Sequence, residues 1–220
     1  MVRYARAAVI AAAAAVLACG CSRKNTVYEP DTAESSLYLT SEGTVTSVDV
    51  ETYEADYYDA AELKASVEEA LSFFNGAHAG KKAEDGSEIA AATLLECDLK
   101  DGTALLSIQF MDPASYLEFE EEYPDPDGAV QVTNLDVTTV SDAITKGYLV
   151  GETFQNAGDS DKTASSGEIA KEGGLYVAAV WGKALIQTDG EIRYASQGVS
   201  LLGANKAETP EGQVTYLVFR

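Results

Sequence analysis

Residues 95–110, LECDLKDGTALLSIQF, have the pattern of two β-strands joined by a tight turn. Leu95, Cys97 and Leu99 alternate with charged residues, which is typical of a half-buried strand. Asp101-Gly102 is a dipeptide that commonly joins hairpin strands, and the apolar segment 104–110 supplies the partner strand. The stretch therefore predicts an antiparallel hairpin. Cys97 shares the face of Leu95 and Leu99 in this pattern, so we expect a small core residue rather than a nucleophile.

A helix is predicted on each side of this hairpin. Before it, Asp59 has the position of an N-cap, with Glu62 completing a capping box, and the helix is expected to end at Asn75-Gly76. The apolar stripe of this helix is Leu63, Val67, Leu71 and Phe74. After the hairpin, Asp112-Pro113 opens a second helix that is expected to stop at Pro124.

Further strands are expected before and after this part of the chain. Residues 37–40 and 45–50 form a predicted hairpin, and the last fifty residues carry several apolar strand patterns, ending with 214–219. The fold class predicted is α+β: an antiparallel sheet with two helices packed on one face, followed by a β-rich C-terminal part. The predicted divisions are 1–18 signal peptide, 19–36 flexible tether, 37–154 ββαββα part, 155–174 linker or long loop, and 175–220 β-rich part completing the same domain or forming a second one.

The N-terminus has the features of a lipoprotein signal peptide. Twelve apolar residues, 7–18, follow Arg3 and Arg6, and this run is too short for a membrane span, which needs about 20 residues. The small residue Ala18 precedes Cys19, which we expect to carry the lipid, with Cys21 as the alternative. An ordinary signal peptide with a soluble product is the other interpretation. The lipobox favours a chain anchored to the outer face of the cytoplasmic membrane, through its N-terminal lipid only.

Composition limits the class of partner. The 220 residues are 46% hydrophobic, which is enough for a folded core, and their formal net charge is −21. Such an acidic surface repels phosphate groups, so nucleic acid is excluded as a partner. With three cysteines and one expected to be acylated, no disulfide framework is predicted.

The usual catalytic sets are not apparent. The single histidine, His78, lies in a stretch of Gly, Ala and Lys, where we expect it to be exposed and unpartnered. One histidine and one spare thiol do not make a zinc site, and no nucleophile elbow is present. The chain is therefore predicted not to be an enzyme and to need no cofactor.

Two weaker signals concern ligands. Acidic residues are densest at 118–122 and at Asp125 and Asp127, which we interpret as a solvated patch in preference to a calcium site. Tyr53, Tyr57 and Trp181 are the aromatic side chains that a sugar-binding surface would use.

Several segments carry a resemblance to a known group of proteins. The matching residues are Gly43-Thr44-Val45, Tyr57-Tyr58-Asp59 with Glu62-Leu63, Asp112 with Tyr116 and Phe119, residues 189–196, and 216–219. On these residues the chain resembles uncharacterised lipoproteins of gut Firmicutes. This resemblance implies a lipid-anchored extracytoplasmic protein but supplies no site residue. The expected function is a non-enzymatic binding or scaffolding module at the cell surface. The alternative is a substrate-binding lipoprotein for glycans or peptides that serves a transporter, and a cell-wall-directed hydrolase is the third expectation.

Overall fold

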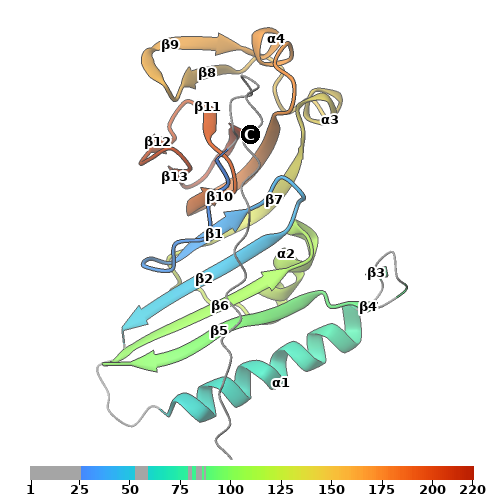
Figure 1. Cartoon of the computed structure of the whole chain (residues 1–220), viewed down its shortest axis with the longest axis vertical. Coiled ribbons are helices and arrows are strands. Elements are labelled where there is room, and N and C mark those ends of the chain that lie inside the picture. The colour runs from blue at the N-terminus through green and yellow to red at the C-terminus, as the bar shows by residue number, and fades with distance from the viewer. Residues whose placement is uncertain (1–25, 53–58, 79–80, 83–85, 87) are drawn as a thin grey trace, which may run out of the picture.

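The computed structural model describes residues 26–52, 59–78, 81–82, 86 and 88–220. Within them, twelve strands form one large sheet and four helices accompany it, which confirms the α+β fold class (Figure 1). None of these described helices combines the length and the apolar character that crossing a membrane requires. The predicted strand and helix order, ββαββα, is confirmed, with one short extra hairpin inserted before the third strand.

The helices are α1 (Ala60–His78), α2 (Pro113–Glu122), α3 (Val140–Thr145) and α4 (Ser166–Ile169). The strands of the large sheet are β1 (Ser36–Leu39), β2 (Val45–Thr52), β5 (Ala92–Lys100), β6 (Thr103–Phe110), β7 (Gln131–Thr139), β8 (Thr153–Asn156), β9 (Asp159–Ser165), β10 (Tyr176–Thr188), β11 (Ile192–Ser196), β12 (Ser200–Leu201), β13 (Lys206–Thr209) and β14 (Val214–Phe219). The short extra hairpin is β3 (Lys81–Lys82) with β4 (Glu88–Ile89).

The sheet runs in the order β5-β6-β2-β1-β10-β14-β11-β8-β9, with β7 and β13 also paired to β10. Every described pairing in it is antiparallel except that of β1 with β10, which is parallel. Helices α1 and α2 cover the same face of β2 and β6, as predicted. Their N-caps are also confirmed, since Asp59 Oδ1 accepts from the N–H of Ala61 and Asp112 Oδ1 accepts from the N–H of Ser115.

Strand β10 connects the two halves of the sheet. Its first half pairs with β7 and β14, and its second half pairs with β1 and β13. Alternate side chains enter two different cores: Ala178 and Val180 face the core under α1 and α2, whereas Val177 and Ala179 face the core under α3 and α4. The sequence predicts two strands here, at 175–181 and 184–187, but a β-bulge at Gly182 lets one strand continue.

A second β-bulge, in β5, places Leu95 on the opposite face of the strand from the one that the sequence predicts. The register of β5 against β6 shifts between Leu94 and Glu96, so Leu94 pairs with Ile108 and Leu95 is 51% exposed. Leu95 therefore does not share the face of Cys97 and Leu99, because one extra residue in a strand reverses the alternation.

Residues 155–174 also differ from the predicted linker or long loop. They contain the end of β8, the whole of β9 and helix α4, and β8 pairs antiparallel with both β9 and β11. Ile169 of this region is fully buried, in the same core as Phe154 just before it. The polar composition of β9 reflects its position at the edge of the sheet, where none of the described strands pairs with its outer side.

The described part of the predicted flexible tether lies along the sheet instead. The side-chain amide of Gln187 accepts from the N–H of Asp31 at 2.8 Å and donates to the carbonyl of Asp31 at 2.8 Å. Lys206 forms an ion pair with the Asp31 carboxylate, and the N–H of Tyr28 donates to the carbonyl of Asp189. These hydrogen bonds and this ion pair hold residues 26–35 against β10 and β13.

Candidate functional site

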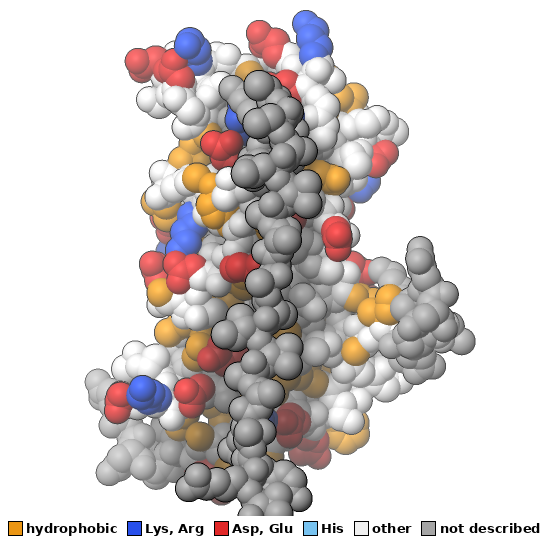
Figure 2. Space-filling model, viewed as in Figure 1, with side chains coloured by type: hydrophobic (Ala, Val, Ile, Leu, Met, Phe, Trp, Pro, Cys, Tyr) orange, Lys and Arg blue, Asp and Glu red, His pale blue; other side chains and the backbone are white. Residues whose placement is uncertain are grey.

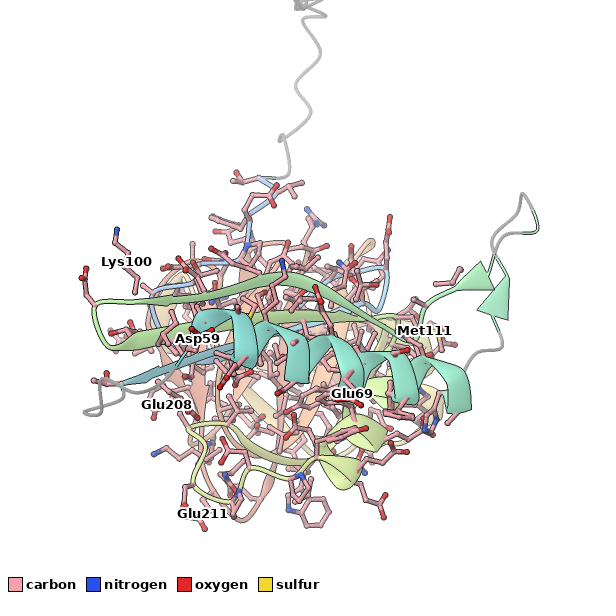
Figure 3. The ribbon with its side chains drawn as sticks, turned by 90° about the horizontal axis from the view of Figure 1, so that it is seen from below. Asp59, Glu69, Lys100, Met111, Glu208 and Glu211 are labelled. Atoms are coloured by element: carbon pink, nitrogen blue, oxygen red, sulfur yellow. The ribbon has the colours of Figure 1, made fainter. Side chains whose placement is uncertain are left out.

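A cleft of about 320 Å³ lies between α1, α2 and the face of β2 and β6 that these helices cover. In Figure 3, α1 runs alongside β5 and β6, with Asp59 near its start and Glu69 farther along. The walls of the cleft are largely apolar, and the principal side chains are Leu63, Val67, Leu106, Ile108, Phe119 and Val130. This volume and lining are those of a small-molecule site.

The cleft exists because α1 packs closely at only one end. Leu71 and Phe74, in its second half, are 5% and 0% exposed, whereas Leu63 and Val67, in its first half, are only partly buried. The side chain of Asn75 holds the closely packed end of α1 against β5. It donates to the carbonyl of Ala92 at 2.8 Å and accepts from the N–H of Ala92 at 2.9 Å. The first half of the helix therefore has room beneath it.

His78 holds the same close end of α1 against α2. Its Nδ1 lies 3.0 Å from Glu118 Oε2 and its Nε2 lies 2.8 Å from Glu122 Oε1, while its ring stacks on Phe74 at 4.3 Å. The hydrogen bond to Glu122, together with the two negative charges, raises the pKa of His78. The expectation of an exposed, unpartnered His78 is wrong because α1 continues past Asn75-Gly76 and carries the imidazole to α2.

Two partly buried carboxyl groups enter the cleft from different elements. Asp49 comes from β2 and Glu120 from α2. Burial, with the nearby charges of Glu51 and Asp125, raises the pKa of Asp49 to about 6. Burial, with the charges of Asp49 and Asp125, raises the pKa of Glu120 to about 7. Such perturbed pKa values in a cleft mark a candidate functional site.

No basic side chain balances these groups among the described residues that line the cleft. Asp49, Glu51, Glu120 and Asp125 all contribute to the lining, and Lys, Arg and His do not. Beneath them the side chain of Tyr116 is 1% exposed, and burial raises the pKa of its hydroxyl group. Acidic side chains are also spread over the face of the molecule in Figure 2, with few basic ones between them.

In the acidic run at 118–122, Glu118, Glu121 and Glu122 are exposed, as a solvated patch predicts, whereas Glu120 is partly buried and lines the cleft. Glu118 and Glu122 also bind His78. A helix explains this division, because Glu118 and Glu122 are four residues apart and Glu120 is four residues after the buried Tyr116.

Sequence reasoning missed Asp49 and Glu120 as site residues. A signal was present for Glu120, which shares the face of the buried Tyr116 on α2. None was present for Asp49, because Ser47 and Glu51, which share its face of β2, are polar and do not predict burial. A charged residue at a position whose period predicts burial is the sign that sequence analysis can use.

The candidate calcium residues lie at and beyond the edge of the cleft. Asp125 lines it, and its Oδ1 accepts from the N–H of Asp127 at 3.2 Å, while Asp127 is exposed. In the part of the chain that the structure describes, no three His, Cys, Asp or Glu side chains are grouped closely enough to hold a metal ion.

The aromatic candidates are not brought together. Trp181 is 49% exposed on β10, next to Val214 on β14, and it does not line the cleft. Tyr53 and Tyr57 lie outside the described residues, as do the lipid-attachment candidates Cys19 and Cys21. Cys97 is half-buried opposite Leu106, and burial raises the pKa of its thiol, which disfavours the nucleophilic thiolate.

Comparison with known proteins supplies no relative. No protein-family model matches the chain, and neither the curated proteins nor the solved structures provide a significant match.

Proposed function

We propose that this chain is an extracytoplasmic ligand-binding protein and that the cleft between α1, α2 and the sheet is its ligand site. The observation that carries the proposal is the cleft itself: about 320 Å³, largely apolar, with the carboxyl groups of Asp49 and Glu120 directed into it. A core built only for stability does not retain such a space beside partly buried acids, because both features cost free energy of folding.

The proposal predicts that filling the cleft abolishes binding. Nile red is a suitable neutral, apolar probe, because its fluorescence rises in apolar surroundings. Ala70 lines the cleft from α1, so Ala70→Trp should remove Nile red binding, and Ala65→Trp on the exposed side of the same helix is the matched control. Binding that is equal in both variants, or absent from the unmodified protein, would contradict the proposal.

The proposed location follows from the N-terminal sequence. The apolar run 7–18 and the small residue before Cys19 support cleavage and acylation at Cys19, with Cys21 as the alternative. Attachment to the outer face of the membrane would then occur through the lipid. Mass spectrometry of the mature N-terminus tests this, and an unmodified thiol at both positions would refute it.

A hydrolase, the third expectation from the sequence, is favoured as a second candidate by one observation. Two carboxyl groups whose pKa values are raised to about 6 and 7 can supply one protonated and one ionised group near neutral pH. Turnover of chromogenic glycosides that is lost in Glu120→Gln would favour this activity over binding alone.

Transport of a glycan or peptide would need a permease partner, which a pull-down from solubilised membranes would detect.

A further inference from the structure

The cleft combines apolar walls with carboxyl groups, and no Lys, Arg or His is among the described residues that line it. Asp49 and Glu51 approach from β2, Glu120 from α2, and Asp125 from the segment after α2. The helix α1 and the strand β6 contribute Leu63, Ser66, Val67, Ala70, Ala104, Leu106 and Ile108, none of which is charged. An ammonium group complements this arrangement, and an anionic ligand would meet repulsion from every charged group in the lining.

We propose that the cleft selects a small organic cation, whose apolar body packs between α1 and β6 and whose ammonium group binds Asp49 and Glu120. This inference rests on the proposed function of the cleft as a ligand site. The volume of about 320 Å³ suits a small molecule rather than a folded partner. A bare metal ion is less suitable, since the described residues contain no group of three side chains placed to hold one.

Binding of such a cation would be coupled to loss of protons. Without a ligand, burial raises the pKa of both groups, with the charges of Glu51 and Asp125 acting on Asp49 and those of Asp49 and Asp125 acting on Glu120. A positive charge between them favours the ionised forms. The affinity for a cation should therefore rise between pH 5 and pH 8, whereas the affinity for a neutral ligand of the same shape should not.

Three probes with one apolar body test the inference: octylammonium, octanol and octanoate, each measured by displacement of Nile red from the full chain. At pH 8 we expect octylammonium to bind about tenfold more tightly than octanol, which corresponds to about 1.4 kcal/mol, and octanoate to bind least. The advantage of octylammonium should shrink at pH 5. It should also shrink in Asp49→Asn/Glu120→Gln, when octylammonium and octanol are compared on that same variant.

Two other outcomes separate failure of this inference from failure of the proposed function. Equal displacement by octanol and octylammonium at pH 8 would overturn the selection of a cation and leave the cleft as an apolar ligand site. No saturable binding of Nile red or of any octyl probe would overturn both. The pH series needs no substitution, so it tests the inference even where a variant fails to fold.

Discussion

At the scale of single residues, Asp49 and Glu120 carry carboxyl groups that are more easily ionised in the unfolded chain than in the folded one. The folded state therefore holds more protons between about pH 4 and pH 7, and the free energy of unfolding falls as pH rises through this window. The same two groups that suit a ligand thus reduce stability in its absence, as is common for functional sites.

Because the raised pKa values make the free energy of unfolding fall as pH rises, we can predict the stability of Asp49→Asn. At pH 8 the variant should be more stable than the unmodified chain by about 1–2 kcal/mol, because it removes a partly buried charge. At pH 4 the difference should disappear, since Asp49 is then protonated. Urea unfolding at both pH values measures it, with Asp98→Asn on the exposed side of β5 as the control. A variant that is less stable at pH 8 than at pH 4, relative to the unmodified chain, would contradict the raised pKa.

His78 should show the opposite pH dependence. Its pKa is raised by Glu122 and Glu118, so its charged form stabilises the contact of α1 with α2 below about pH 6.5, and this stabilisation is lost as pH rises through the raised pKa. We expect His78→Gln to lower the melting temperature more at pH 6 than at pH 9. Glu121→Gln, between the two partners on α2, should show no such difference. If His78→Gln lowers the melting temperature equally at both pH values, His78 stabilises the fold through its stacking on Phe74 and not through its charge.

At the scale of elements, β10 depends on a glycine. Gly182 has φ +127°, and a Cβ atom there would lie 1.9 Å from the carbonyl oxygen of Gln131 on β7. We predict that Gly182→Ala lowers the free energy of unfolding by about 3 kcal/mol or more.

Gly76 provides the matched control within α1, where an added Cβ atom meets nothing within 4 Å. Gly76→Ala should raise stability by about 0.5–1 kcal/mol, as alanine is favoured over glycine inside helices. Denaturant titration of the two variants compares them directly. An unchanged midpoint for Gly182→Ala would show that β7 and β10 can separate at the bulge at little cost.

Elements with local signals could be predicted from the sequence. The caps Asp59 and Asp112 and the last strand, 214–219, follow from neighbouring residues alone. The continuous β10, the bulge beside Leu95 and the strand β9 could not be predicted, because each depends on a partner strand that is distant in sequence. The candidate site was missed for the same reason: Asp49 and Glu120 come near each other only when α2 packs against the sheet.

At the scale of the whole molecule, residues 26–35 fix how the chain enters the sheet. Their bonds to Gln187 and Lys206 leave six residues between Cys19 and Thr26, so the seven steps from Cys19 to Thr26 reach at most about 25 Å. A lipid at Cys19 would therefore keep the sheet close to the membrane surface.

Deleting residues 26–35 from a chain that starts at Thr26 should lower the free energy of unfolding by about 2 kcal/mol, since the two hydrogen bonds between Asp31 and Gln187 contribute about 1 kcal/mol each. Thermal or urea unfolding of the two chains measures the difference. Equal stability would mean that this segment is not fastened in solution.

The central claim is that the cleft under α1 is the ligand site, and mapping of amide chemical shifts tests it most directly. Titration of the ¹⁵N-labelled chain with octylammonium at pH 8 should shift the amide signals of Ser47, Asp49, Leu106 and Glu120, which line the cleft. The signals around Trp181 on β10 should stay in place. Shifts that cluster at Trp181 and Val214 instead, or no saturable shift anywhere, would contradict the account.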